Sequence, residues 1–340
     1  MTLLMKKRVV ELTADQIQPK EVTWLWYPRI AAGTITLVGA RGGTGKGMFL
    51  VDIAARITTG DLWPTKQRER APKGCVLWCE TEDMIEETVL PRLIAAEADR
   101  KRVIIKKSAR ELFAIEDLRE YIEQRNVRLI VLSPLNSFLD IEDANNGKSV
   151  REGMERLQSC IEGTDCAIVG ICHLNKKADL DAIERLLGSV EYVNFVRNVL
   201  LLHAEKGTDD VRVVHAKQNI SKKGRDLLFT KVNRRPDDKR SAYWGVDDWR
   251  AADEDIDQDD MYRRKGEDDA KDAKSARHWL IEQLADGAWH DLDDVVRSAE
   301  KYSHSKSALQ RAQQRSRGKI ESKRTGFGPD QRTLWRVVLS

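Results

Sequence analysis

Long apolar segments are absent from this sequence. No run of apolar residues approaches the length that a membrane-spanning helix needs, and the N-terminus lacks the long apolar core of a secretory signal. Charged residues instead make up 33% of the chain, and the mean hydropathy is −0.52. We therefore expect a cytoplasmic protein with no membrane partner.

Cysteine is also scarce, and its spacing carries no metal or disulfide pattern. The five cysteines are Cys75, Cys79, Cys160, Cys166 and Cys172. They lie in or beside apolar segments, where a thiol behaves as a small apolar side chain. Zinc sites and disulfide frameworks show paired spacings such as Cys-x-x-Cys, which do not occur here, so we predict buried free thiols.

A strong excess of either charge is missing from the chain as a whole, whose formal net charge is +3. The distribution is uneven, however. From Ala273 to Ser340 there are 13 Lys and Arg against 8 Asp and Glu, a net charge of +5, whereas the first 272 residues carry 45 against 47, a net charge of −2. The basic excess of the C-terminal part predicts a polyanionic partner there.

A glycine-rich segment stands between two regular elements near the N-terminus. The β-branched run Thr34–Val38 predicts a strand, and the apolar residues of Met48–Thr59 recur at helical spacing. Glycines let backbone N–H groups approach phosphate oxygens, the helix N-terminus adds positive potential, and a lysine neutralises the β- and γ-phosphates. The segment therefore predicts a site for a nucleoside triphosphate. Its residues are Gly42, Gly43, Thr44, Gly45, Lys46, Gly47 and Met48.

Two features of the usual phosphate-binding motif are missing. The position after the lysine is normally Ser or Thr, whose hydroxyl ligates Mg²⁺, but here it is Gly47. The first glycine of the motif is replaced by Ala40. The glycine cradle is present, but one metal ligand is absent.

Apolar runs alternate with amphipathic segments through the first two thirds of the chain. Further strands are expected at residues 75–79, 103–105, 127–132, 166–172, 199–203, 211–216 and 227–230. Such strands form a mostly parallel sheet covered by helices on both faces, so we predict an α/β fold. Ligands bind at the carboxyl ends of these strands. Because Glu82, Ser133 and His173 stand at three strand ends, we expect them to converge with Lys46.

The chain is long for a single core, which favours two domains. We expect an N-terminal arm at residues 1–20 and a nucleotide-binding domain at 21–245. Residues 246–272 are rich in Asp and almost free of large apolar side chains, which predicts an acidic flexible linker. A small domain at 273–340 would follow.

Three helices and a β-hairpin are expected in this C-terminal domain, which is the order of a winged helix. The helices would span residues 275–285, 292–301 and 305–317, and the strands 320–325 and 334–339. The third helix would present four basic side chains to a DNA backbone. They are Lys306, Arg311, Arg315 and Arg317. The alternative is a protein-interaction winged helix with a solvated basic face.

Residues from about Trp24 to Gly245 resemble the RepA-like hexameric helicases, which are RecA-fold ATPases of plasmids and phages. The resemblance rests on an ordered series of short segments. They are residues 24–26, the phosphate loop, Glu82-Asp83, the strand at 129–134, Asn145 with Val150-Arg151, residues 173–176, Gly188-Ser189, Arg197 and residues 217–219. The tail resembles the winged-helix appendage of many phage and prophage members.

The resemblance implies a RecA-like core that uses ATP and Mg²⁺ and assembles into a hexamer. Lys46 would bind the β- and γ-phosphates, Glu82 would activate the attacking water, and His173 would sense the γ-phosphate. Lys217, or Arg212 on the same strand, would reach the nucleotide of the neighbouring subunit. Structural alternatives stay open: Glu82 as a helix-capping group, His173 as a core histidine and Lys217 as a solvated strand residue.

The resemblance also implies a path for DNA. Polar loops at residues 140–149 and 176–187 would face a central pore, where Lys148, Lys176 and Lys177 would track single-stranded DNA. The C-terminal domain would bind duplex DNA.

The metal side of the site departs from the family a second time. The strand that usually ends in an Asp, which holds Mg²⁺ through water, ends here in Ser133. The hydroxyl of Ser133 and the carboxylates of Asp83 or Glu80 are the remaining candidates for holding the metal. Since metal bridging of the β- and γ-oxygens is central to phosphoryl transfer, the sequence favours ATP binding over fast hydrolysis.

Three functions compete on these grounds. The first is an ATP-driven hexameric helicase that translocates on single-stranded DNA in phage or plasmid replication. The second, which the residues Gly47 and Ser133 favour, is a nucleotide-gated DNA clamp or loader with weak or no hydrolysis. The third is a recombination mediator or signalling ATPase of the same fold, because one fold serves all three.

Overall fold

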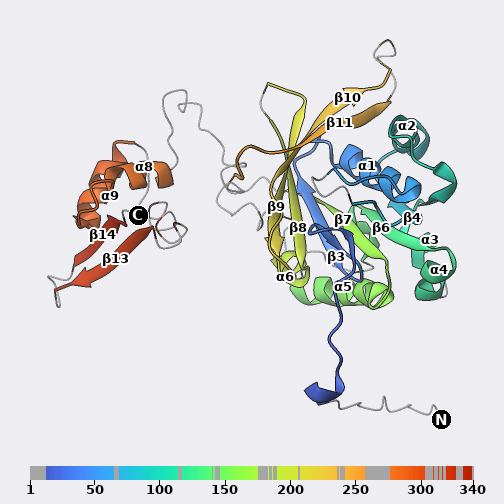
Figure 1. Cartoon of the computed structure of the whole chain (residues 1–340), viewed down its shortest axis with the longest axis horizontal. Helices are drawn as coiled ribbons and strands as arrows, with labels where there is room; N and C mark the ends of the chain where they lie inside the picture. The colour runs from blue at the N-terminus through green and yellow to red at the C-terminus, as the bar shows by residue number, and fades with distance from the viewer. Residues whose placement is uncertain are drawn as a thin grey trace. The chain divides into compact units, whose positions relative to one another are not determined.

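The computed structural model places most of the chain in two compact units, Met1–Tyr262 and Arg263–Ser340 (Figure 1). It describes residues 13–64, 69–113, 117–139, 141, 146–174, 183, 186, 190–205, 207–235, 237, 242–256, 276–302, 309, 313, 316, 319–326 and 332–338.

A nine-stranded sheet forms the centre of the first unit. Its strand order is β11-β10-β9-β8-β3-β7-β6-β4-β5. The strands from β8 to β5 are parallel, and β9, β10 and β11 extend the sheet in antiparallel fashion. The nine strands are β3 (Ile35–Ala40), β4 (Cys75–Glu80), β5 (Val103–Lys106), β6 (Val127–Ser133), β7 (Ala167–His173), β8 (Asn198–Ala204), β9 (Asp210–Gln218), β10 (Leu227–Asn233) and β11 (Trp244–Ala251).

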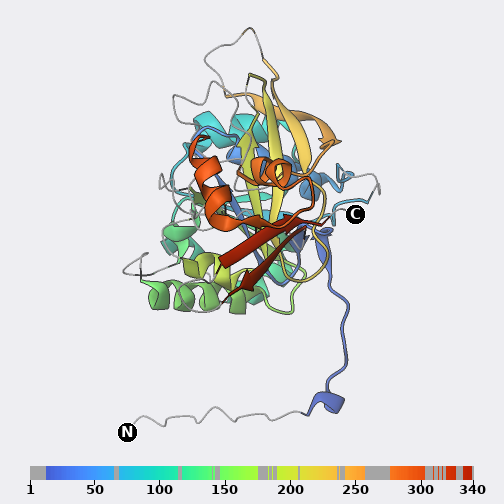
Figure 2. The same ribbon diagram turned by 90° about the vertical axis from the view of Figure 1, so that its left-hand side faces the viewer.

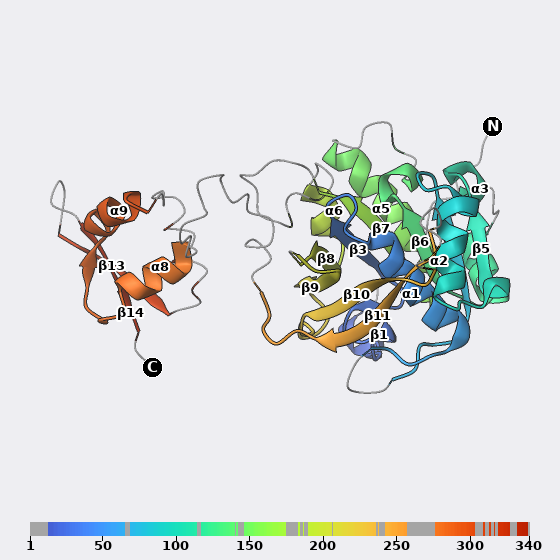
Figure 3. The ribbon, with the colours of Figure 1, turned by 90° about the horizontal axis from the view of Figure 1, so that it is seen from above.

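Helices cover both faces of the sheet because successive strand residues point to opposite sides. In β4, Val76 and Trp78 pack into one core cluster, whereas Leu77 and Cys79 pack into the other. The first face carries α1 (Lys46–Thr59) and α2 (Leu90–Ala95). The second carries α3 (Ala109–Phe113), α4 (Leu118–Gln124), α5 (Gly147–Ile161) and α6 (Val190–Phe195) (Figures 1 and 3). This architecture, with β3 in the middle of a mostly parallel sheet, confirms the predicted α/β, RecA-like P-loop core.

A small hairpin of β1 (Trp24–Trp26) and β2 (Ile30–Ala31) precedes the sheet, after a short helical turn at η1 (Ala14–Gln16). Trp26 is only 1% exposed and stacks on Trp63, with ring centroids 5.0 Å apart. Its ring also lies 6.1 Å from that of Trp249 on β11. Trp26 is therefore part of the core under α1.

Strand β11 corrects the predicted start of the linker. Residues 246–251 pair with β10 and belong to the sheet, although the Asp-rich composition predicted a flexible segment from residue 246. Beyond the strand, Asp255 accepts a hydrogen bond from the N–H of Asp226, and Ile256 donates its N–H to the Asp226 carboxylate. This strand was not predicted because its apolar residues, Trp244, Val246 and Trp249, do not alternate strictly, and charged residues stand between Val246 and Trp249. Residues 257–272 of the predicted linker lie outside the described part of the chain.

The second unit has its own apolar core. Its elements are α8 (Ala276–Gln283), β12 (His290–Asp291), α9 (Leu292–Glu300), β13 (Ile320–Thr325) and β14 (Arg332–Val337). Figure 2 shows β13 and β14 as a hairpin in red beside the orange helices. The short β12 pairs with β14 and completes a three-stranded sheet, which the sequence did not reveal. The core includes Trp279, Leu280, Leu292, Ile320 and Trp335.

The winged-helix assignment of this unit stays a prediction. The expected third helix, at residues 305–317, falls almost wholly outside the described residues, where only Leu309, Gln313 and Ser316 are placed. Leu309 and Ser316 are buried.

All five cysteines are free thiols, as predicted. Cys79, Cys166 and Cys172 are buried, and burial raises the pKa of the Cys79 thiol to about 12. Cys75 and Cys160 are partly exposed, so the predicted burial holds for three of the five thiols. Among the described helices, none combines the length and apolar character that crossing a bilayer requires.

Candidate functional site

The phosphate loop connects the end of β3 to the start of α1, as the sequence predicts. Gly43 and Gly45 have backbone φ angles of +74° and +113°, in the left-handed region where a side chain is strained. A Cβ placed on Gly42 or Gly43 would meet no atom within 4 Å. The loop is therefore open beside these two glycines, which is what a bound phosphate chain needs.

Other predicted loop residues are fixed by packing. Thr44 is 6% exposed, and Met48 packs partly against the core on the α1 face of the sheet. The carbonyl of Gly45 accepts the N–H of Phe49, which begins the hydrogen bonding of α1. The strand and helix on either side thus hold the loop rigidly.

Lys46 turns its ammonium group back into the loop. Its Nζ donates to the carbonyls of Ala40 and Arg41, both at 3.2 Å, and lies 3.5 Å from Nδ1 of His173. The residue is 7% exposed, and this burial lowers the pKa of the lysine, while the nearby Glu82, Cys172 and Asp83 act in the opposite direction. The two carbonyl acceptors are weaker partners than an anion, so a phosphate group would be a favourable replacement for them.

The carboxyl ends of neighbouring parallel strands meet beside this lysine. Ala40 at the end of β3 pairs with His173 at the end of β7. Nε2 of His173 lies 3.1 Å from Oε2 of Glu82, which follows β4. Both side chains are about half exposed, so they can meet a ligand from solvent. The structure thus brings together Lys46, His173 and Glu82, which we call the lysine side of the loop.

Glu80 positions the segment that carries Glu82. Its Oε1 accepts three backbone N–H groups, from Thr81 at 3.1 Å, Glu82 at 3.0 Å and Asp83 at 3.1 Å. Its Oε2 accepts the indole N–H of Trp78 at 3.3 Å, and the residue is 3% exposed. Both oxygens of this carboxylate are occupied by hydrogen bonds. The geometry therefore gives no support to Glu80 as a group that holds a metal ion.

Ser133 and Asp83 are the predicted metal ligands. Ser133, at the end of β6, is 7% exposed, and its carbonyl accepts the N–H of Thr81 at 3.0 Å. Asp83 forms an ion pair with Arg92 of α2, with Nη1 and Oδ2 2.9 Å apart. Because the Asp83 carboxylate already has a cationic partner, the geometry gives its role as a metal ligand no support. Within the described residues, no group of three or more His, Cys, Asp and Glu side chains is arranged to hold a metal ion.

The guanidinium of Arg92 lies over Gly47. A Cβ built on Gly47 would be 2.8 Å from Nη1 of Arg92 and 3.9 Å from Oδ2 of Asp83. A serine or threonine at this position would force the guanidinium to move. We call Gly47, Ser133, Asp83 and Arg92 the glycine side of the loop. The residues present here do not fit the Mg²⁺ site of the usual motif, and no sequence pattern indicated Arg92.

The two residues predicted to act across a subunit boundary lie on β9 and are engaged within their own chain. Lys217 donates to the carbonyl of Val193 at 2.7 Å, and burial, together with the charge of Arg197, lowers its pKa. Arg212 bonds to Glu205 at 2.7 Å and lies 3.7 Å from Asp226. Their predicted roles require these contacts to open.

Of the predicted DNA-binding residues, the structure describes only Lys148. Lys148, in the first turn of α5, is 86% exposed at its side chain and lies 3.9 Å from Glu152. The others lie outside the described residues: Lys176, Lys177, Lys306, Arg311, Arg315 and Arg317.

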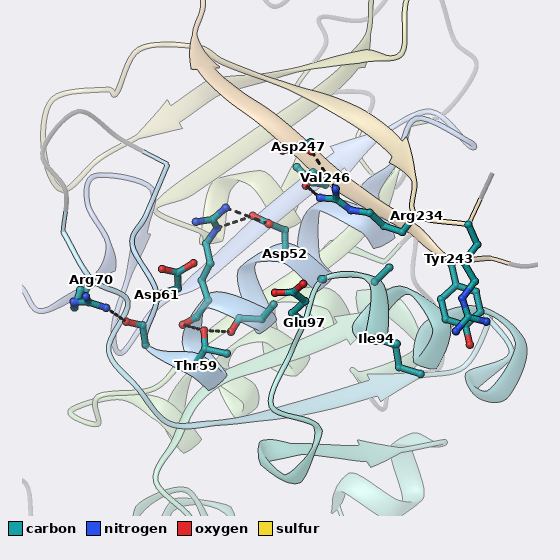
Figure 4. Close-up of a pocket in the computed structure, with 16 residues that line it drawn as sticks. Asp52, Thr59, Asp61, Arg70, Ile94, Glu97, Arg234, Tyr243, Val246 and Asp247 are labelled. Carbon is teal, nitrogen blue, oxygen red and sulfur yellow. Dashed lines mark hydrogen bonds and ion pairs between the residues drawn. The ribbon is translucent and has the colours of Figure 1, made fainter. Parts of the chain in front are cut away.

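A polar cavity of about 740 Å³ lies on the first unit, away from the phosphate loop (Figure 4). The C-terminal half of α1, the end of α2 and the β10–β11 hairpin line it. Two ion pairs lie in its lining, Asp52 with Arg56 at 2.8 Å and Arg234 with Asp247 at 3.2 Å. None of the predicted site residues lines this cavity.

Comparisons with known proteins identify a family that matches part of this chain. Residues 3–179 match the protein family described as AAA domain. A search of curated protein sequences finds no match to the chain. Among solved structures, the chain is similar to one whose title describes an ATPase domain, with 13% sequence identity and a TM-score of 0.43, over 58% of this chain and 81% of that one. The family match spans just over half of the chain, whereas this structural likeness carries no functional information.

Proposed function

The chain belongs to the AAA domain family, and from that premise we propose that it is an ATP-driven translocase of the RepA-like helicase type, acting on single-stranded DNA. The observation that carries the proposal is the lysine side of the phosphate loop. There an ammonium, an imidazole and a carboxylate follow one another at 3.5 Å and 3.1 Å, beside a glycine-rich loop at a helix N-terminus. This series suits a nucleoside triphosphate and a water molecule next to its γ-phosphate.

Each side chain of the lysine side has a role in hydrolysis. The ammonium of Lys46 binds the β- and γ-oxygens and stabilises the charge that develops there. The carboxylate of Glu82 orients the attacking water and accepts its proton. His173 touches both groups, so departure of the γ-phosphate would change its hydrogen bonds and pass the change to the loop that follows β7.

Assembly into a hexamer is part of the proposal. Lys217 pairs in register with Val199, which in turn pairs with Leu37 of β3, so it lies several residues from the strand ends that carry the phosphate loop. It would therefore reach a nucleotide across a subunit boundary, after leaving the carbonyl of Val193. In such a ring Lys148, Lys176 and Lys177 would face single-stranded DNA in the pore.

The second unit would bind duplex DNA as a winged helix. Strand β13 carries Lys323 and Arg324, both exposed, and Nζ of Lys323 lies 4.1 Å from the ring centroid of Trp289. With the net charge of +5 for residues 273–340, this basic hairpin supports a polyanionic partner.

A nucleotide-gated DNA clamp with slow hydrolysis is the second candidate. The glycine side favours it, because Gly47 and Ser133 lack the groups that usually hold the metal and Arg92 engages Asp83. Such a protein would still bind ATP and DNA, but turnover would not drive movement.

Steady-state ATP hydrolysis by the full chain, with and without single-stranded DNA, tests the proposal. We expect hydrolysis that rises when single-stranded DNA is added, and a smaller rise for Lys148→Ala. Lys101→Ala, another exposed lysine of the first unit, should behave as the parent. ATP binding without DNA-stimulated hydrolysis would favour the clamp, and a chain that binds no ATP would contradict both.

A further inference from the structure

The glycine side of the phosphate loop carries an arginine in the region that a metal ion serves in the usual motif. We propose that the chain binds the ATP polyphosphate without a divalent cation, and that the Arg92 guanidinium supplies the positive charge on this side. The proposal deepens the function proposed above and rests on it, because it concerns the same nucleotide site.

Space is the first observation. The Cβ position of Gly47 is 2.8 Å from Nη1 of Arg92 and 3.8 Å from its Cζ. Contacts shorter than about 3.0 Å are essentially never made by a real Cβ, so a side chain at residue 47 would require the guanidinium, the end of a flexible side chain, to shift from its present place. The loss of the usual hydroxyl and the presence of the guanidinium are thus two aspects of one arrangement.

Charge is the second observation. Asp83 is the remaining acidic side chain on this side, and its Oδ2 bonds Nη1 of Arg92 at 2.9 Å. The strand end that usually supplies an acidic group carries the neutral Ser133. A cation would have to displace Arg92 from Asp83, whereas a phosphate oxygen would find a guanidinium already held in place.

The third observation is the donor capacity of Arg92. A guanidinium has five N–H groups, stays charged at any pH that the protein survives, and binds phosphate in bidentate geometry. Its bond to Asp83 uses one nitrogen, and its Nε is buried without a hydrogen-bond partner in the described part of the chain. The Arg92 side chain is 21% exposed, so a ligand in the loop can reach it.

Local structure explains how Arg92 arrives there. The segment after Asp83 begins with a π-helical turn at Ile85–Val89 and continues into α2, whose first turn contains Pro91. A π turn widens the helix and shifts the residues that follow it, and such turns are frequent at functional sites. The shift directs Arg92 back toward Asp83, nine residues earlier in the chain.

The experiment measures binding of a fluorescent ATP analogue, 2′/3′-O-(N-methylanthraniloyl)-ATP, to the full chain in excess EDTA and in excess MgCl₂. We expect similar dissociation constants in the two media for the parent protein. Arg92→Ala should weaken binding in EDTA by about tenfold or more, the cost of losing one hydrogen bond to a charged group. Addition of Mg²⁺ to this variant should restore part of the affinity, because Asp83 is then free to approach the cation.

Arg128→Ala is the matched control. Arg128 bonds Asp165 at 2.6 Å, its side chain is 25% exposed, and its Nε is likewise buried without a partner in the described residues. Its ion-pair partner Asp165 and its neighbour Gly74 are not residues of the phosphate loop, so its removal should leave both dissociation constants unchanged. Gly47→Ala provides a second variant, because the added methyl group would displace the guanidinium while leaving Arg92 in the chain.

The outcomes separate this proposal from the function on which it rests. Tight binding in MgCl₂ with none in EDTA would overturn the role of Arg92 and leave ATP binding intact. An Arg92→Ala protein that folds, by its circular dichroism spectrum, and binds as the parent does in EDTA would also overturn it. Absence of binding in both media would contradict the proposed ATP site itself.

Discussion

The two sides of the phosphate loop lie at the same edge of the sheet but have different chemistry. The lysine side has its ammonium, imidazole and carboxylate in contact, at 3.5 Å and 3.1 Å. The glycine side has lost a hydroxyl at Gly47, and an arginine engages its Asp83. The comparison teaches that the groups proposed to bind phosphate and activate water can be complete while the groups that usually hold the metal are replaced.

The largest expected effect belongs to the lysine side. Glu82→Gln keeps the size of the side chain but removes the base, so the rate of ATP hydrolysis should fall by about 10²- to 10⁴-fold with ATP affinity nearly unchanged. Phosphate release under saturating ATP, with a binding titration beside it, measures both. Glu87→Gln, an exposed carboxylate in the following turn, should behave as the parent. If Glu82→Gln hydrolysed ATP at the parent's rate, the Glu82 carboxylate would have no part in the mechanism. The lysine side would then lack a catalytic group, as the glycine side lacks its metal ligands.

Removal of the ammonium should have the next largest effect. Lys46→Ala deletes a charged donor to the phosphates, so ATP affinity should fall by about 10- to 100-fold. Some affinity should remain if Arg92 supports the other side of the loop. Isothermal titration calorimetry would detect the difference. Unchanged affinity would place the nucleotide elsewhere in the molecule.

Restoring an acidic group on the glycine side should have a moderate effect in the opposite direction. Ser133→Asp should raise hydrolysis severalfold, and only when Mg²⁺ is present, because the carboxylate gives the cation's water shell an acceptor. Combining it with Arg92→Ala should increase the gain by freeing Asp83. An equal rate with and without Mg²⁺ in these variants would show that this side does not accept a metal.

The smallest expected effect is a difference between Lys46 and Arg92 in how ATP binding depends on pH. Burial lowers the pKa of Lys46, and bound phosphate favours its protonated form, so affinity should be constant at low pH and fall as pH rises through the lysine's pKa. A guanidinium group keeps its charge throughout the pH range in which proteins are studied. The remaining affinity of Lys46→Ala should therefore be insensitive to alkaline pH. ATP titrations of the parent and of Lys46→Ala at increasing pH, with a melting curve at each pH to check folding, measure this difference. An equal loss of affinity in both proteins would contradict it.

The sequence predicted the lysine side because each of its members follows from a local pattern. A strand, a glycine loop and a helix place Lys46, and apolar runs with polar residues at their carboxyl ends place Glu82 and His173. In a parallel sheet those ends meet at one edge, so proximity follows from the strand pattern alone. The predicted convergence of Ser133 with the loop has the same origin, through the pairing of β4 with β6.

The glycine side could not be predicted in the same way. Arg92 reaches Gly47 through the π turn and the packing of α2 against the sheet, neither of which has a clear sequence period. Glu80 looked like one more acidic residue of the site, whereas its oxygens serve three backbone N–H groups. Strand β12 has two residues, too short for any pattern, and it exists because β14 offers an edge. Tertiary packing decided each of these.

Glu80 makes the two sides of the loop inseparable in one respect. One oxygen of its carboxylate accepts the backbone N–H groups of both Glu82 and Asp83, so the proposed water-activating group and the partner of Arg92 are tied together to the end of β4. Mutations that improve one side by shifting this segment will therefore disturb the other, and their effects will be epistatic rather than additive. Adaptation of the site is easiest through side chains that keep the segment still, and Ser133 is a position of that kind.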